Sequence, residues 1–305
     1  MRLVSYRDRR GKTCTGAVIN SRVIELTHTI AALPFPASIA DQNIAAPAGS
    51  MMHLLHAGPD GLAAARRVID ATHAANNLDQ HPLLSDVHLD APIPRPGKIL
   101  GIGRNYADHA RETGVQPFER PRIFAKLPSS VVGPGAVVVR PTGVVKMDLE
   151  AELAVVIGRV ASNVPRSEAL NMVAGYSILN DVSAREFQFD VTPPQTSFAK
   201  SMDGFCPMGP WLVTADEIAD PQALEIRSYL NGNAMQHGNT ADMLFRVDQL
   251  IEYLSGYITL EPGDVIATGT PAGIGAFRSP PIWLRPSDRI RIDISGIGTL
   301  EHSIG

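Results

Sequence analysis

Cysteine, long apolar runs and clustered positive charge are all scarce in this sequence. Its 305 residues include only Cys14 and Cys206, with no C-x-x-C pair, which excludes a disulfide framework and a thiolate zinc site. No apolar run approaches the roughly 18 residues needed to cross a bilayer, and the stretch MRLVSYRDRRGKT is charged from its start. We therefore expect a protein of the reducing cytoplasm that is neither secreted nor embedded in a membrane.

Basic residues do not outnumber acidic ones. The chain has 27 Lys and Arg against 31 Asp and Glu, a formal net charge of -4, and its basic residues are scattered rather than gathered in a run. A surface for nucleic acid normally shows the opposite balance. The expected partner is therefore a small molecule and not a polyanion.

Two regions of the chain differ in how apolar and polar residues alternate along them. Residues 1–92 combine an early alternation of apolar and polar residues with the Ala-rich stretch GPDGLAAARRVIDATHAANN, which predicts a helix beginning near Asp60. The proline-rich stretch Asp90–Lys98 cannot hold a regular element. Residues 93–305 then carry many short β-like runs between Gly and Pro turns. The sequence predicts a β-dominated α+β protein, with a small N-terminal α+β domain before a larger one.

The stretch MDLEAELAVVIG, residues 147–158, has acids at alternate positions. Read as one strand, it places Asp148, Glu150 and Glu152 on the same face, and the apolar run that follows points to the interior. The alternative is a solvated edge strand. Asp181 closes another apolar run and adds a third carboxylate to Glu150 and Glu152. Three carboxylates without a nearby His or Cys suit a hard cation, Mg²⁺ or Mn²⁺, with positions left for water and substrate.

A histidine with an acidic neighbour follows the predicted strand ILGIG. Residues 106–113 can form about two helical turns, in which His109 and Glu112 share one face at i, i+3 spacing. A carboxylate beside an imidazole fixes its tautomer and raises its basicity, as a general base requires. The alternative is a surface histidine with a chance acidic neighbour.

Two lysines lie between apolar residues. Lys126 in FAKLPSS, and Lys200 with Asp203 in FAKSMDGFCPMGP, could be ordinary amphipathic side chains or could supply charge to a developing oxyanion. Thr270, in ATGTPAGIGAF, could hydrogen-bond a substrate carboxylate or belong to a structural turn. That glycine-rich stretch lacks the Lys-Ser/Thr ending of a P-loop, and GIGRNY lacks the third glycine of a dinucleotide fingerprint, so nucleotide binding is not expected.

In their order and spacing, seven motifs resemble the fumarylacetoacetate hydrolase superfamily over most of residues 98–305. They are GIGRNYADHARE, FAKLPSS, MDLEAELAVVIG, GYSILNDVSAREFQ, KSMDGFCPMGPWLVTADEI, NGNAMQHGNTADMLF and EPGDVIATGTPAGIG. The first 90 residues resemble the small N-terminal domain that many members, including two-domain bacterial ones, carry. The resemblance implies a rolled, mixed β-sheet that holds one divalent cation, and a homodimer.

The resemblance also implies roles for individual residues. The metal ligands match Glu150, Glu152 and Asp181, and the catalytic positions match His109, Glu112 and Lys200. Positions near the substrate or the metal are Lys126, Arg185, Gln188 and Thr270, and we assign Asp203 to the same substrate-binding group. One departure is Met235-Gln236-His237, where many members have Arg-Gln before the GNT run.

Members of the superfamily mostly act on 2-oxo acids. The leading hypothesis is a Mg²⁺- or Mn²⁺-dependent hydrolase that cleaves a C–C bond in a 2,4-dioxo acid such as an acylpyruvate, giving a carboxylic acid and a pyruvate-type product. Aromatic or sugar-acid catabolism would supply such a substrate. The alternative is a decarboxylase or isomerase of 2-oxo dicarboxylic acids of the oxaloacetate kind. A third reading, a metal-bound binding protein without catalysis, requires neither His109 and Glu112 nor Lys200.

Overall fold

The computed structural model describes residues 1–34, 46–112, 114, 116 and 118–305. Strands dominate it, and the predicted α+β class is confirmed. Its helices are α1 (Thr27–Ala31), α3 (Met51–His56), α4 (Gly58–Ala74), α5 (Ala107–Glu112), α6 (Arg166–Ala169), α7 (Thr196–Ala199) and α8 (Val247–Ser255). The predicted Ala-rich helix is α4, which begins at Gly58 rather than Asp60 because Pro59 is accommodated in the first helical turn.

Among the described residues, the largest sheet has 11 strands. Its main path is β3 (Arg22–Glu25), β2 (Thr13–Ile19), β1 (Arg2–Arg7), β13 (Cys206–Thr214), β11 (Val173–Asn180), β10 (Ala151–Ile157), β16 (Val265–Ala267), β5 (Ile99–Gly103) and β6 (Arg122–Lys126). Two short strands join it from the side, with β4 (His88–Leu89) on β1 and β7 (Val131–Val132) on β13. The sheet therefore runs through both predicted regions of the chain.

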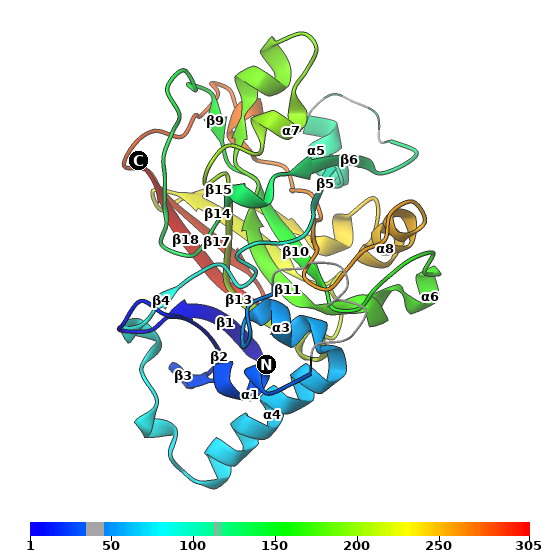
Figure 1. Ribbon diagram of the computed structural model, residues 1–305. Coiled ribbons are helices and arrows are strands. Elements are labelled where there is room, and N and C mark those ends of the chain that lie inside the picture. The colour runs from blue at the N-terminus through cyan, green and yellow to red at the C-terminus, as the bar shows by residue number, and fades with distance from the viewer. Residues whose placement is uncertain (35–45, 113, 115, 117) are drawn as a thin grey trace.

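A second sheet packs against the first. It has the order β15 (Asn233–Asn239), β14 (Glu225–Leu230), β17 (Arg289–Ile294), β18 (Gly298–Ile304) and β8 (Val137–Val138), and a separate pair joins β12 (Ser183–Ala184) to β9 (Met147–Asp148). In Figure 1 these strands lie with β10 and β11 in the larger upper part, and β1 to β3 with α1, α3 and α4 form the lower part. Both parts contain strands and helices, as expected.

The central strand β10 is buried along its whole length. Leu153, Val155 and Ile157 belong to one hydrophobic cluster, which includes residues of the second sheet. Ala154 and Val156, on the opposite face, belong to a cluster that includes Leu3 and other residues of the N-terminal region. Two buried faces explain why the strand has a continuous apolar run rather than alternation.

The N-terminal region shares the large sheet instead of forming a sheet of its own. Strand β1 pairs antiparallel with β13, where Arg2 faces Val213 and Leu3 faces Leu212. The stretch at 90–98 contains no helix or strand, as its prolines predict. The division of the chain at residue 92 stays a prediction.

The acidic stretch at 147–158 is not one strand, so that part of the sequence prediction is wrong. The ladder is interrupted between β9 and β10, at Leu149 and Glu150. The Glu150 N–H donates to the side-chain Oδ1 of Asn180 at 2.9 Å, and a side-chain partner of this kind competes with ladder pairing. The solvated-edge alternative is also wrong, because β10 lies between β11 and β16.

Candidate active site

Four strand ends meet at one edge of the large sheet. Strand β10 starts where β11 ends, since Ala151 faces Asn180 in the antiparallel register. Strand β16 is antiparallel to β10 and parallel to β5, so the carboxyl ends of β16 and β5 lie at the same edge. The residues just before β10 and just after β11, β16 and β5 are therefore brought together, and these are the segments that carry the sequence motifs.

The three predicted ligand carboxylates lie together. One oxygen each from Glu150, Glu152 and Asp181 can be chosen so that all lie within 4.8 Å of one another. All three residues are buried, with exposures of 7%, 1% and 0%. Glu152 accepts a hydrogen bond from the Gly269 N–H at 2.8 Å, which fixes one of its oxygens. The described residues give Glu152 no lysine or arginine ion pair.

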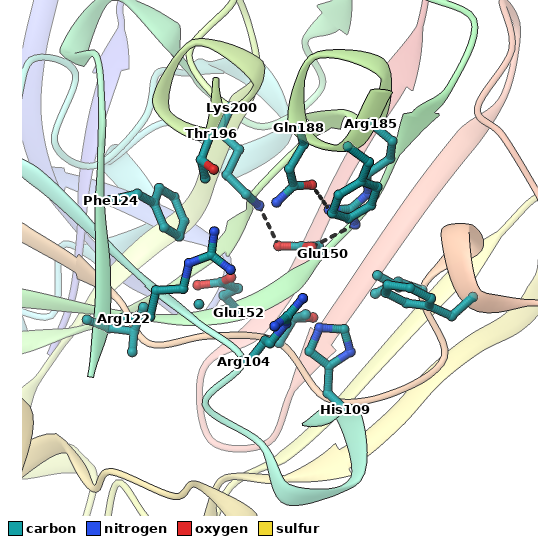
Figure 2. Close-up of a pocket in the computed structure, with 16 residues that line it drawn as sticks. Arg104, His109, Arg122, Phe124, Glu150, Glu152, Arg185, Gln188, Thr196 and Lys200 are labelled. Atoms are coloured by element: carbon teal, nitrogen blue, oxygen red, sulfur yellow. Dashed lines mark hydrogen bonds and ion pairs between the residues drawn. The ribbon is translucent and has the colours of Figure 1, made fainter. Parts of the chain in front are cut away.

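Lysine and arginine side chains hold the other acids. Lys200 Nζ donates to Glu150 at 2.7 Å, to Asp181 at 2.5 Å and to the Ser183 hydroxyl at 2.8 Å. Arg185 donates to Glu150 at 2.7 Å from the other side (Figure 2). Positive charge near the acidic stretch follows from the cost of burying like charges together, because each buried carboxylate requires a partner.

Burial and charge set the pKa values of the acids in opposite directions. Burial, and then the charges of Asp181 and Glu150, raise the pKa of Glu152 well above its usual value. Burial also acts to raise the pKa of Glu150, but Lys200 and Arg185 outweigh it and hold that pKa below the usual range. Of these two acids, Glu152 is therefore the one whose ionised form is less stabilised by the protein and would gain more from a nearby positive charge.

The charge balance of the buried cluster fits a divalent cation. Four buried carboxylates face three buried cations; the acids are Asp148, Glu150, Glu152 and Asp181, and the cations are Lys126, Arg185 and Lys200. The acids outnumber the cations by one, and within the described part of the chain Glu152 is the acid of this group without an ion pair, so a cation bound beside it would favour its ionised form. The donor atoms are carboxylate oxygens, the ligands that Mg²⁺ and Mn²⁺ prefer. The residues therefore fit the predicted metal.

A histidine and a glutamate form a pair at the same edge. On α5, His109 is 5% exposed, and its Nδ1 lies 3.1 Å from the Glu112 carboxylate. Glu112 also accepts from the Gly273 N–H at 3.1 Å. Gly273 has φ +103°, and a Cβ there would lie 2.3 Å from the Met235 carbonyl oxygen, so only glycine fits. If Nδ1 donates to Glu112, Nε2 is left as a proton acceptor.

One cavity connects these groups. Its lining includes His109, Glu150, Glu152, Arg185 and Lys200. Figure 2 shows the histidine on one side of Glu150 and Lys200 on the other, with Phe124 on the same side as Lys200. The cavity therefore presents the acidic cluster, a candidate base and a lysine to one bound molecule.

The other predicted residues occupy distinct places. Gln188 lines the cavity and accepts from Arg185 at 2.7 Å. Lys126 is buried outside the cavity lining, where its Nζ donates to Asp181 at 2.7 Å and to the carbonyl oxygens of Lys200 and Phe205. Lys126 therefore holds a candidate ligand and does not face the cavity.

Thr270 lines the cavity, but its hydroxyl already donates to the Ala151 carbonyl at 2.9 Å and accepts from Gln236 at 2.6 Å. Gln236 belongs to the segment that departs from the superfamily pattern, and it is buried, joining Thr270 to the start of β10. Asp203 is exposed and is not among the residues that line the cavity. The structure therefore does not bring Asp203 to the other predicted residues, and their individual roles stay predictions.

Three residues of the site were not selected from the sequence as site residues. Asp148 accepts from Arg185 at 2.8 Å and from the Gly275 N–H at 2.8 Å, and so fixes the arginine beside Glu150. Arg104 and Arg122 both line the cavity. The only sequence signal for Arg104 is its place in GIGRNY, shortly before His109.

Known proteins are similar to this chain over most of its length. The family model described as fumarylacetoacetate (FAA) hydrolase C-terminal matches residues 98–305. The human mitochondrial oxaloacetate tautomerase is 40% identical over 257 residues, which cover 84% of this chain and 79% of that protein.

Solved structures are similar over the whole chain. Fumarylacetoacetate hydrolase from Exiguobacterium antarcticum has a TM-score of 0.80 at 32% identity, covering 100% of this chain and 99% of that one. Maleylpyruvate hydrolase from Sphingobium sp. SYK-6, in complex with manganese(II) and pyruvate, has a TM-score of 0.74 at 30% identity, covering 100% and 98%. The chain belongs to the fumarylacetoacetate hydrolase family.

Proposed function

We propose that this protein moves a proton at the carbon next to the keto group of a 2-oxo acid, and so interconverts the keto and enol forms of an oxaloacetate-like substrate. The observation that carries the proposal is a buried, polarised histidine, His109 with Glu112, in the same cavity as the acidic cluster. The 40% identity to an oxaloacetate tautomerase supports it.

The ligand residues would be Glu150, Glu152 and Asp181. When bound there, Mg²⁺ or Mn²⁺ would polarise the carboxylate and keto oxygens of the substrate and stabilise the negative charge of an enolate. Lys200, already in contact with Glu150 and Asp181, adds a second positive charge beside that position. Its three hydrogen bonds fix the ammonium group in place before substrate binds.

His109 would act as the base. Its Nε2 takes the proton from the carbon next to the keto group, and the C–H electron pair forms the C=C bond while the keto oxygen gains negative charge. Glu112 stabilises the imidazolium through Nδ1, and the Gly273 N–H holds Glu112 in position. The same proton then returns to the oxygen of the substrate, which gives the enol, or to the carbon in the reverse direction.

The second candidate is hydrolysis of a C–C bond in a 2,4-dioxo acid. The likeness to a maleylpyruvate hydrolase whose structure holds manganese and pyruvate favours it. In this reaction His109 would take a proton from water, which attacks the distal carbonyl and releases a carboxylic acid and a pyruvate-type enolate. Decarboxylation of oxaloacetate would give a similar enolate by loss of CO₂ and needs no activated water.

The test follows both reactions with metal-stripped protein, before and after Mn²⁺ or Mg²⁺ is added. The conversion of the enol form of oxaloacetate to the keto form is measured, and so is the cleavage of acetylpyruvate. Both are compared with blanks that contain metal alone, since free metal ions also catalyse enolisation. We expect metal-dependent interconversion that falls by about 10²–10⁴-fold in His109→Ala. Acetylpyruvate cleavage without effect on the oxaloacetate enol would instead establish the hydrolase.

A matched pair of variants tests the base more finely. Glu112→Gln keeps the shape of the side chain but removes the charge that stabilises the imidazolium, so we expect a lower turnover number with little change in KM. Glu119→Gln, at an exposed position further along the same segment, removes the same charge outside the cavity. Equal effects of the two variants would contradict a catalytic pair.

Location and assembly are part of the same proposal. Among the described residues, no helix is both long and apolar enough to cross a membrane. We propose a cytoplasmic enzyme, although several relatives are named as mitochondrial proteins. We also propose a homodimer without a nucleic-acid partner, and sedimentation analysis would test it, since a monomer at micromolar concentration would contradict the dimer.

A further inference from the structure

Arg104 has an unusual backbone conformation at the mouth of the cavity. It follows the last residue of β5 and has φ 57°, in the left-handed region that a residue with a side chain rarely adopts. Such a conformation is unfavourable for a residue with a side chain and persists where the surroundings impose it. Here the next residue, Asn105, is fully buried and bonds to the Phe245 and Thr268 carbonyls and the Phe245 N–H.

The side chain of Arg104 is half-buried and forms no ion pair with any described residue. The guanidinium carbon lies over the ring of Phe118, 5.7 Å from its centroid. Burial, and then the positive charge of Arg122, lower the pKa of Arg104. Arg104 and the exposed Arg122 thus lie close enough for their positive charges to repel each other, and no carboxylate of the described residues forms an ion pair with either of them.

Arg122 completes the arrangement. It begins β6, which pairs with β5 so that Arg122 faces Gly103, the residue before Arg104. Neither arginine forms an ion pair with a described residue, in contrast to Arg185 and its two carboxylates. Figure 2 shows Arg104 and Arg122 reaching into the cavity from below, with Lys200 and Arg185 above.

We propose that Arg104 and Arg122 form a carboxylate subsite, so that the preferred substrates are 2-oxo dicarboxylic acids. The inference rests on the proposed function, in which the 2-oxo carboxylate end of the substrate occupies the acidic cluster through the metal. The other end then extends toward the cavity mouth, where two free guanidinium groups match the geometry of a carboxylate. A monocarboxylic substrate would leave both arginines unpaired.

Equilibrium binding of 2-oxo acids tests the subsite separately from the rate of turnover. The probes are 2-oxoglutarate and 2-oxopentanoate, which have the same carbon count and differ in the distal carboxylate, together with oxalate, which has no distal group. Affinity for Mn²⁺-loaded protein is measured by calorimetry. We expect wild-type protein to bind 2-oxoglutarate about tenfold or more tightly than 2-oxopentanoate, because its distal carboxylate would pair with the half-buried Arg104 and with Arg122.

The variants are chosen so that folding is preserved. Arg104→Gly removes the guanidinium and suits the left-handed backbone, and Arg122→Ala removes the second charge. Each should lower the preference severalfold, the double variant should bring it close to one, and oxalate affinity should change little. Arg122→Lys should restore part of the preference, since lysine keeps the charge but not the fork of donors.

Arg120→Ala is the matched control, because Arg120 is exposed, precedes Arg122 on the same segment and does not line the cavity. It should leave the preference unchanged. Equal affinity of wild-type protein for the two oxo acids would overturn the proposal, and so would a preference that survives in the double variant. A protein that binds dicarboxylates but fails to tautomerise oxaloacetate would refute the proposed reaction while leaving the subsite in place.

Discussion

His302 connects acid stability to the candidate ligand Glu150. It lies on β18, is 4% exposed, and its Nε2 is 2.8 Å from the Asn180 Nδ2. Because Nδ2 can only donate, Nε2 must be the unprotonated acceptor. The other side of the Asn180 amide, Oδ1, accepts from the Glu150 N–H. Protonation of His302 would therefore break the hydrogen bond that holds the Asn180 side chain, whose Oδ1 binds the backbone N–H of a candidate metal ligand.

The size of the effect follows from the pKa. Burial lowers the pKa of His302 from 6.5 to about 4. As pH falls below 6.5, the unfolded chain binds a proton at this residue before the folded chain does, so stability is present above 6.5 and is lost toward pH 4. At about 1.4 kcal/mol per pH unit, the loss is about 2 kcal/mol at pH 5 and about 3 kcal/mol at pH 4.

Urea unfolding at pH 7 and pH 5 measures this loss. In His302→Gln the amide oxygen can accept the same hydrogen bond but cannot titrate, so its stability should fall by about 2 kcal/mol less than that of wild-type protein. His73→Gln, at an exposed position of α4, is the control and should behave like wild-type. If His302→Gln loses as much stability as wild-type between the two pH values, His302 is not the residue responsible.

Three further predictions concern the metal cluster and its support. Glu150→Gln combined with Glu152→Gln should abolish Mn²⁺ binding in calorimetry while the circular dichroism spectrum stays native, and retained turnover would contradict the ligand assignment. Mn²⁺ should raise the melting temperature of wild-type protein by relieving the excess negative charge around Glu152, and no shift at saturating metal would refute that charge balance. Gly269→Ala should lower the free energy of unfolding in urea by about 2 kcal/mol or more. The reason is that Gly269 has φ +98° and that a Cβ there would lie 2.7 Å from the Cβ of Asn105. An unchanged urea midpoint would contradict this prediction.

Much of the site could be predicted from local patterns. Glu150, Glu152 and Asp181 stand beside apolar runs that had to be buried, and an antiparallel pair of strands is enough to bring them together. The pairing of His109 with Glu112 requires only one helical turn, so its spacing predicted the contact that α5 makes. These parts depend on residues close in sequence or on one pair of strands.

Other features depend on partners that no local pattern reveals. The break before β10 arises because the Asn180 side chain, thirty residues away, takes the Glu150 N–H. The pairing of β1 with β13 joins segments about two hundred residues apart. The left-handed turn at Arg104 reflects the bonds that Asn105 makes to two distant loops, and the position of Asp203 on the surface could not be distinguished by sequence from that of Lys200.

The claim that Glu150, Glu152 and Asp181 hold the catalytic cation has one direct test. Crystals grown with Mn²⁺ are measured near the manganese absorption edge, and the anomalous difference map is calculated. We expect one strong peak among the three carboxylates, with ligand oxygens at roughly 2 Å. A map without a peak at that position, for protein whose turnover survives removal of divalent metal, would contradict the claim.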